Sequence, residues 1–208
     1  MEKITIGILG IQGSREEHEK MLKKLKCNVK WVRTPDQLSG INGLIIPGGE
    51  STAIGKIIKK NGLYDKLLRQ VKSGLPVWGT CAGAILLAIN GSPYSLKLID
   101  IDIERNAYGR QNESFITDIN FQDKPFKAVF IRAPKITKTA KNVKILARHA
   151  QDPIIVRQDN IMASTFHPEL TNDIAIHKYF LEKCIKPKHG RILQTHHLFP
   201  HNFSIKKN

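Results

Sequence analysis

The sequence predicts an α/β fold built on a mostly parallel β-sheet, and three observations predict it. Apolar runs of strand length alternate with amphipathic runs of helix length through the first half of the chain, which is typical of strand–helix units. The 208 residues are 41% hydrophobic, enough to bury a core without disulfides or a metal. No internal repeat and no linker rich in Pro, Gly or Ser divides the sequence, so a single domain is expected.

The first half supplies the strand–helix units in order. Each expected strand is a short apolar run, and each expected helix carries apolar residues at helical spacing. Strands are expected at residues 4–9, 29–32, 44–46 and 77–78, and helices near residues 14–25, 53–60, 64–73 and 84–88. In the first of these helices acidic residues precede basic ones, the order that complements the helix dipole.

The second half has a different pattern, with short strands and little helix between them. Strands are expected at residues 99–103, 128–131, 143–147, 153–156 and 161–165, and a final helix at about 171–184. Strands without crossover helices favour antiparallel pairing. We therefore expect this half to extend the sheet with antiparallel strands at its edge.

The charge balance is strongly basic, with 33 Lys and Arg against 18 Asp and Glu and a net charge of +15. The lysines are spread over helix faces, and no zinc-finger or RNP-type pattern accompanies them, so we expect no nucleic-acid partner. No apolar run approaches the roughly 18 residues that span a membrane, and the start of the chain does not resemble a signal peptide. We expect a cytoplasmic protein with no membrane partner, in which Cys27, Cys81 and Cys184 stay reduced.

The segment 186–208 differs from the rest of the chain, because it is basic, holds four of the eight histidines and contains no acid. Chain ends of this composition are commonly mobile. Its His196, His197 and His201 lack the Cys or carboxylate that would complete a metal site. The expected division is one folded domain at residues 1–185 and a flexible tail at 186–208, with no metal.

Cys81 lies in the segment Gly79-Thr80-Cys81-Ala82-Gly83, between a strand and an apolar helical run. Small residues on both sides of one nucleophile are what a tight strand-to-helix turn requires. Such a turn exposes the sulfur at the carboxyl edge of the sheet, at a helix N-terminus that lowers a thiol pKa and beside N–H groups that can bind an oxyanion. A buried structural cysteine is the alternative, but packing alone would not need glycine on both sides.

His167-Pro168-Glu169 follows the last expected strand. In an extended chain, residues two apart point the same way, so we expect Glu169 to contact the His167 ring. A carboxylate that orients a histidine completes a set of nucleophile, base and orienting group. Most pairs of this kind are incidental surface residues, and this pair gains its meaning from Cys81.

The segment Pro47-Gly48-Gly49-Glu50-Ser51-Thr52 joins a buried strand to a helix. Two glycines allow a sharp turn that presents N–H groups to an oxyanion or a substrate carboxylate. An ordinary turn in which Ser51 or Thr52 caps the helix is the other interpretation, and the two are compatible.

These three motifs resemble those of class I, triad-type glutamine amidotransferases. Three further segments are similar to the glutaminase subunit of pyridoxal 5'-phosphate synthase, the Pdx2 or PdxT family. They are GIQG at 10–13 with Glu17 and His18, ERNAYGRQ at 104–111, and FIRAP at 130–134. The resemblance runs in the same order from about Ile4 to Cys184.

The resemblance implies a three-layer, flavodoxin-like α/β fold with a central mixed sheet. It also implies hydrolysis of L-glutamine to glutamate and ammonia through a γ-glutamyl thioester on Cys81. His167 would act as base and then acid, Glu169 would orient it, and the N–H groups of Ala82 and Gly49 would bind the oxyanion. The residues implied to bind glutamine are Gly48, Gly49, Glu50, Ser51, Arg105, Ile131 and Arg132.

The resemblance further implies a hetero-oligomeric complex in which ammonia passes to a Pdx1-type synthase subunit, with no cofactor in this chain. The sequence departs from the family pattern at Lys97, where a turn glycine is expected, and in the length of the tail. Two alternatives remain open. One is a glutaminase that serves another acceptor, such as imidazole glycerol phosphate synthase, and the other is a non-catalytic binding or regulatory protein on the same scaffold.

A glutaminase that worked without its partner would waste glutamine, so we expect docking to complete the oxyanion site. The turn at Gln12 and Gly13 is the expected lever, because it ends the first strand at the same edge of the sheet as Cys81 and Gly48. The alternative is that Gln12 only caps the following helix.

Overall fold

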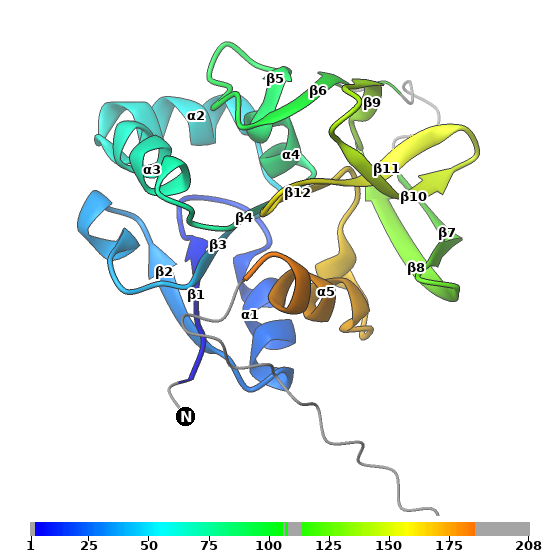
Figure 1. Cartoon of the computed structure of the whole chain (residues 1–208), viewed down its shortest axis with the longest axis horizontal. Coiled ribbons are helices and arrows are strands. Elements are labelled where there is room, and N and C mark those ends of the chain that lie inside the picture. The colour runs from blue at the N-terminus through cyan, green and yellow to red at the C-terminus, as the bar shows by residue number, and fades with distance from the viewer. Residues whose placement is uncertain (1–2, 106, 108–113, 186–208) are drawn as a thin grey trace, which may run out of the picture.

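The computed structural model describes residues 3–105, 107 and 114–185 (Figure 1). Predictions made for residues 106 and 108–111 and for the tail at 186–208 therefore fall outside the described residues. None of the described helices is long and apolar enough to cross a membrane.

The central sheet is mostly parallel, as predicted. Within the described ranges it has seven strands in the order β10-β11-β12-β4-β3-β1-β2. The neighbours from β12 to β2 pair in parallel, whereas β10 and β11 pair antiparallel. In that order the strands are β10 (Lys144–His149), β11 (Asp152–Gln158), β12 (Ile161–Ser164), β4 (Val77–Thr80), β3 (Gly43–Ile46), β1 (Thr5–Leu9) and β2 (Asn28–Val32).

Helices cover both faces of this sheet and give the three layers that were expected (Figure 1). Helices α1 and α5 lie on one face, and α2, α3 and α4 lie on the other. Their bounds are α1 (Arg15–Lys24), α2 (Ser51–Lys60), α3 (Leu63–Lys72), α4 (Ala82–Leu87) and α5 (Ala175–Lys183).

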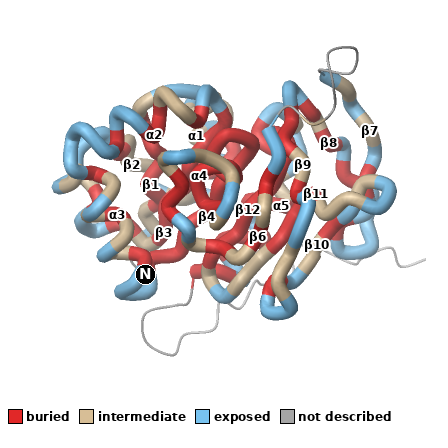
Figure 2. Tube along the Cα trace, turned by 90° about the horizontal axis from the view of Figure 1, so that it is seen from above, coloured by how far each residue is buried: buried red, intermediate tan, exposed pale blue. Residues whose placement is uncertain are grey.

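Alternate residues of the central strands enter two separate cores. Leu44 and Ile46 pack with side chains of α2, α3 and α4, whereas Ile45 between them packs with side chains of α1 and α5. Val77 and Trp78 of β4 divide in the same way. Because both faces are buried, these strands are continuous apolar runs in the sequence. Figure 2 shows them as the buried interior, with exposed residues on the outer helices and loops.

The second half departs from the predicted arrangement. Strand β12 was expected among antiparallel edge strands, but it lies inside the sheet and pairs in parallel with β4. Among the described strands, β10 and β11 form the expected antiparallel extension. Other strands leave the central sheet: β6 (Ile99–Glu104) pairs with β5 (Ala88–Asn90) and β9 (Lys135–Thr139), and β7 (Ser114–Phe121) pairs with β8 (Lys124–Ile131).

Two local features bear on the predictions for single segments. Lys97 has a φ of 55°, the left-handed conformation that favours glycine, so this turn keeps the geometry for which glycine was expected. The last helix begins later than predicted, at Ala175, because Thr171–Ile174 form a non-helical connection after the 3-10 turn at Pro168–Leu170. The carboxylate of Asp173 then accepts a hydrogen bond from the N–H of Ala175 at 2.8 Å, at the start of α5.

Candidate active site

The three motifs meet because the strands before them are neighbours. Strands β3, β4 and β12 lie side by side and run in the same direction. Gly48 follows β3, Cys81 follows β4, and His167 follows β12. Since the carboxyl ends of parallel strands share one edge, the three residues gather at the place where open α/β sheets bind ligands.

Cys81 occupies a strained turn between β4 and α4. Its φ is 48° and its ψ is −104°, a left-handed conformation that a side chain rarely adopts. Gly83 lets α4 approach the sheet closely, because a Cβ there would overlap the carbonyl oxygen of Ile46. The Cys81 side chain is 7% exposed, and its Sγ lies 3.9 Å from the carbonyl oxygen of Ile131. The tight strand-to-helix turn predicted from the sequence is therefore present.

The predicted contact between His167 and Glu169 is present, but it arises differently. His167 Nδ1 lies 2.8 Å from Glu169 Oε1. The two residues do not belong to an extended chain, as we had expected, because Pro168 starts the 3-10 turn that brings Glu169 back toward the ring. Both side chains are buried, so they are held in one geometry.

The Gly48–Gly49 turn lies against the His167 ring, where a Cβ on Gly48 would overlap Cε1. The N–H of Gly48 donates to the Thr80 hydroxyl at 3.1 Å, so this group is occupied. The Gly48 carbonyl faces Gly13. Because the C=O and N–H of one peptide point in opposite directions, the N–H of Gly49 points away from Gly13.

Glu50 and Arg105, two of the residues expected to bind glutamine, pair directly after this turn, and the expected cap of α2 needs one correction. Glu50, not Ser51 or Thr52, is the N-cap of α2, and its carboxylate accepts from the N–H groups of Thr52 and Ala53 at 2.9 and 2.6 Å. A glutamate reaches these groups because its side chain folds back over the first turn. Arg105 pairs with this carboxylate at 3.3 Å and donates to the Thr52 hydroxyl at 3.2 Å.

Three other members of that set lie at the ends of elements. Ser51 is buried at the start of α2. Ile131 ends β8 with 40% of its surface exposed, and Arg132 follows it with a φ of 44°. Ala82 is the first residue of α4, directly after Cys81. The backbone of β8 reaches the site, because the N–H of His167 donates to the carbonyl of Val129 at 2.8 Å.

Burial and neighbouring groups set the charges of this pair. Burial lowers the pKa of His167, but hydrogen bonds to Cys81 and Glu169 outweigh it and raise the pKa to about 10. Burial raises the pKa of Glu169, but contacts with His18, His167 and Ser14 outweigh it and lower the pKa to about 2. At neutral pH the pair is therefore an imidazolium beside a carboxylate.

Two groups that contact Glu169 were not predicted from the sequence. The Ser14 hydroxyl donates to Oε1 at 2.5 Å, and His18 Nε2 lies 3.4 Å from Oε2. The signal was present for His18, because this residue shares the buried face of α1 with Met21 and Leu22. A histidine at helical spacing on an apolar face needs a buried partner.

The substitution Glu169→Gln is expected to destabilise the protein most above pH 4.5 and least near pH 2. The folded-state pKa of about 2 lies below the ordinary value of 4.5. The carboxylate therefore adds stability, on the order of a few kcal/mol, that is complete above the ordinary pKa and is lost as the pH falls through the folded one. Urea unfolding of both proteins at several pH values measures the difference in unfolding free energy. A difference that does not change over this range would contradict the assignment.

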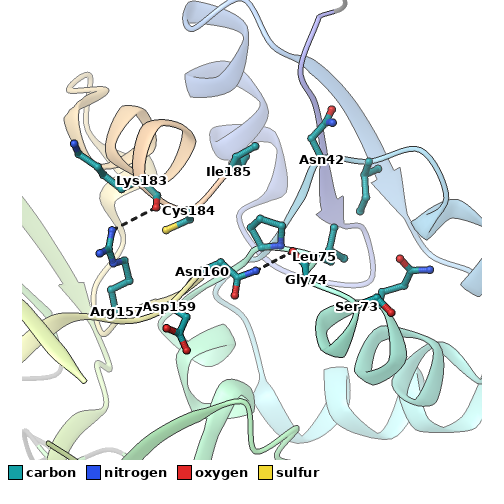
Figure 3. A pocket seen from close by; sticks show the side chains of 13 residues that line it. Asn42, Ser73, Gly74, Leu75, Arg157, Asp159, Asn160, Lys183, Cys184 and Ile185 are labelled. Atoms are coloured by element: carbon teal, nitrogen blue, oxygen red, sulfur yellow. Dashed lines mark hydrogen bonds between the residues drawn. The ribbon is translucent and has the colours of Figure 1, made fainter. Parts of the chain in front are cut away.

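One cavity lies away from this site. It has a volume of about 670 Å³ and is lined by residues such as Asn42, Pro76, Asn160 and Lys183 (Figure 3). Asn42, Pro76 and Asn160 immediately precede β3, β4 and β12, so the cavity opens at the amino edge of the sheet. Cys81 and His167 lie at the opposite, carboxyl edge, and we assign the cavity no part in their chemistry.

Known proteins similar to this chain include a family of glutamine amidotransferases and its members. Residues 8–186 match the SNO glutamine amidotransferase family. Two similar relatives are both named pyridoxal 5'-phosphate synthase subunit PdxT. The one from Thermotoga petrophila is 51% identical over 86% of this chain and 98% of its own length. The one from Thermosipho africanus is 50% identical over 88% of this chain and 100% of its own length.

A solved structure described as a glutamine amidotransferase superimposes with a TM-score of 0.83 at 43% identity, covering 86% of this chain and 98% of that one. A structure of PurLQS from Thermotoga maritima has a TM-score of 0.63 at 14% identity, which is a likeness of fold alone.

Proposed function

The chain belongs to the SNO glutamine amidotransferase family, and from this premise we propose that it hydrolyses L-glutamine to L-glutamate and ammonia for a pyridoxal 5'-phosphate synthase. The observation that carries the proposal is the strained Cys81 at the sheet edge beside a buried, ion-paired His167 and Glu169. A cysteine with a charged histidine neighbour is the arrangement that nucleophilic attack on an amide requires.

The first half of the reaction forms a thioester. The Cys81 thiolate attacks the side-chain amide carbon of glutamine, and the resulting oxyanion is bound by the N–H groups of Ala82 and Gly49. The imidazolium of His167 then gives its proton to the amide nitrogen, the C–N bond breaks, and ammonia leaves. Glu169 keeps the ring oriented through its 2.8 Å contact with Nδ1 and stabilises its positive charge.

The second half restores the enzyme. His167, now neutral, takes a proton from a water molecule that attacks the thioester carbon. The C–S bond breaks, glutamate leaves, and Cys81 returns to the thiolate beside an imidazolium. Arg105 pairs with Glu50 at the start of α2, next to the turn at Gly49, and in this proposal it receives the substrate α-carboxylate. Ser51, Ile131 and Arg132 complete the proposed glutamine site.

We propose that the ammonia acceptor is a Pdx1-type synthase subunit, since the relatives that match almost the whole described chain are named as subunits of that synthase. The test is formation of pyridoxal 5'-phosphate from ribose 5-phosphate and glyceraldehyde 3-phosphate with glutamine as the sole nitrogen source. Product is expected with the wild-type chain and a Pdx1-type subunit, and none with Cys81→Ala. If the chain instead supplied ammonia to the acceptor subunit of imidazole glycerol phosphate synthase, the alternative acceptor would be the correct one.

The partner is expected to raise glutaminase turnover through the turn at Gln12 and Gly13. The alternative in which Gln12 caps α1 is wrong, because Ser14 holds the N-cap position. Gln12 is exposed, and the backbone of this turn packs directly on Gly48 and Gly49. A partner that touches Gln12 can therefore move the oxyanion turn.

Gln12→Ala should accordingly reduce stimulation by the Pdx1-type subunit more than it reduces thermal stability. The measurement is glutamate release by each protein with and without the subunit, beside its melting temperature. Equal turnover in the isolated chain and the complex, unaltered by Gln12→Ala, would contradict this gating.

A further inference from the structure

The second oxygen of Glu169 faces a buried polar cluster of three side chains, His18, Thr80 and His177, which we call the His18 cluster. They come from α1, β4 and α5, and each is 0% exposed. His18 Nε2 lies 3.4 Å from Glu169 Oε2 and 3.2 Å from the Thr80 hydroxyl. His18 Nδ1 lies 2.9 Å from His177 Nε2. The glutaminase mechanism above leaves both histidines without a role.

The contacts of His18 and His177 indicate which ring nitrogens carry protons. Burial lowers the pKa of His18 and of His177, which favours the neutral form of each ring, with one N–H. A carboxylate only accepts hydrogen bonds, so the tautomer of His18 that suits its neighbours carries the proton on Nε2, which hydrogen-bonds the Thr80 hydroxyl at 3.2 Å and faces Glu169 Oε2 across 3.4 Å. Oε2 itself has no hydrogen-bond partner among the described residues. Its Nδ1 then accepts from the Nε2–H of His177. The remaining nitrogen, His177 Nδ1, is an acceptor with no partner among the described residues, which costs less than a buried donor left without one.

Residues of helix α1 thereby contact both oxygens of the carboxylate, one through a hydrogen bond and the other through a longer contact. Ser14, at its N-cap, donates to Oε1, and His18, one turn later on the same face, approaches Oε2. The Thr80 hydroxyl connects His18 to the Gly48–Gly49 turn, because it also accepts a hydrogen bond from the N–H of Gly48. His18 is thus the one ring of the cluster that touches both the carboxylate behind His167 and the group that ties down the oxyanion turn.

We propose that His18 is a positioning residue that fixes the Glu169 carboxylate and, through Thr80, the Gly48–Gly49 turn in one arrangement. The proposal rests on the glutaminase function proposed above. Without the Nε2–H of His18, Oε2 of the buried carboxylate, which has no hydrogen-bond partner among the described residues, loses the N–H that faces it at 3.4 Å. The carboxylate is then free to turn away from His167. The His167 ring and the oxyanion turn then lose their common support.

A purely structural role is the competing explanation. His18 packs edge-on against Trp78, with ring centroids 5.5 Å apart, and His177 does the same at 4.8 Å. Both histidines therefore fill the same core, but only His18 reaches Glu169 and Thr80. A comparison of the two separates positioning from packing.

Two substitutions of His18 differ in which contact of the ring they retain. The side-chain nitrogen of Gln lies near Nε2, so His18→Gln keeps the donor for Glu169 and Thr80. The side-chain amide of Asn lies near Nδ1, where its oxygen can accept from the Nε2–H of His177, so His18→Asn keeps only the contact with His177. His177→Leu is the matched control, because it removes the bond to Nδ1 and leaves Nε2 in place.

In the complex with the Pdx1-type subunit, we expect His18→Asn to lower kcat about 10- to 100-fold, as loss of an orienting partner does at other sites. KM should change much less than kcat, because Glu50, Ser51 and Arg105 of the proposed glutamine site lie outside the His18 cluster. His18→Gln should recover most of the loss. His177→Leu should lower the melting temperature about as much as His18→Asn with little change in kcat.

Alkylation of Cys81 by iodoacetamide gives a readout that needs neither glutamine nor the partner. Its rate should fall in His18→Asn, because a misplaced His167 no longer supports the thiolate, and should remain near wild type in His18→Gln and His177→Leu. If His18→Asn does not fold, Thr80→Val and Thr80→Ser make the same comparison from the other side of the contact, and only the Val variant should lose kcat.

Wild-type kcat and alkylation rate in His18→Asn would overturn the proposal, as would equal losses in His18→Asn and His177→Leu. If the wild-type complex releases no glutamate, the glutaminase function fails, while the alkylation rates still decide the role of His18.

Discussion

Cys81→Ala and Cys81→Ser are expected to abolish glutamine hydrolysis and leave the fold intact. The attacking atom must be a thiolate, which neither a methyl group nor a hydroxyl replaces. Loss of the nucleophile from a catalytic set typically lowers kcat by about four to six orders of magnitude. Glutamate release measures the loss, and circular dichroism with the melting temperature checks the fold.

The same assignment predicts a single covalent adduct with a glutamine-like electrophile. Burial raises the pKa of Cys27 and raises that of Cys184 to about 11, so both remain protonated thiols at neutral pH. Cys81 lies beside the positively charged His167. Mass spectrometry of peptides should find the label on Cys81 alone. A label on Cys27 or Cys184 in place of Cys81 would remove Cys81 as the nucleophile.

His167→Asn is expected to be nearly as damaging, and Glu169→Gln less so. A base that transfers protons in both halves of the reaction has no substitute, and its loss costs about four orders of magnitude or more in kcat. An orienting carboxylate can be replaced in part by the other contacts of the ring. The kcat and KM of each variant for glutamine hydrolysis in the complex measure these effects.

The double variant tests whether the two residues work as one unit. Because Glu169 acts through His167, the pair should lose little more activity than His167→Asn alone. A double variant whose loss equals the product of the two single losses would show that Glu169 acts independently of His167.

The elements that carry the site could be predicted because their signals are local. The strand before Cys81 and the strand before Gly48 are continuous apolar runs, since their alternate residues enter cores on both faces of the sheet. The glycines around Cys81 indicate the close approach of α4. The contact between His167 and Glu169 was predicted correctly, although a 3-10 turn and not an extended chain produces it.

What could not be predicted depends on pairing between distant segments. The parallel pairing of β12 with β4 is decided by tertiary packing, and nothing local distinguishes it from an antiparallel edge strand. Strands β7 and β9 were missed because their exposed faces carry Asp118, Lys138 and similar residues, which interrupt the apolar pattern. The contacts of Ser14 and His18 with Glu169 join residues more than 150 positions apart in the sequence. Such contacts arise only when the chain folds.

The most direct test of the central claim is the release of glutamate from L-glutamine by this chain in the presence of a Pdx1-type synthase subunit. The account predicts catalytic turnover by the wild type, one ammonia for each glutamate, and no turnover by Cys81→Ala under the same conditions. Equal glutamate release by the two proteins, or none by the wild-type complex, would contradict it.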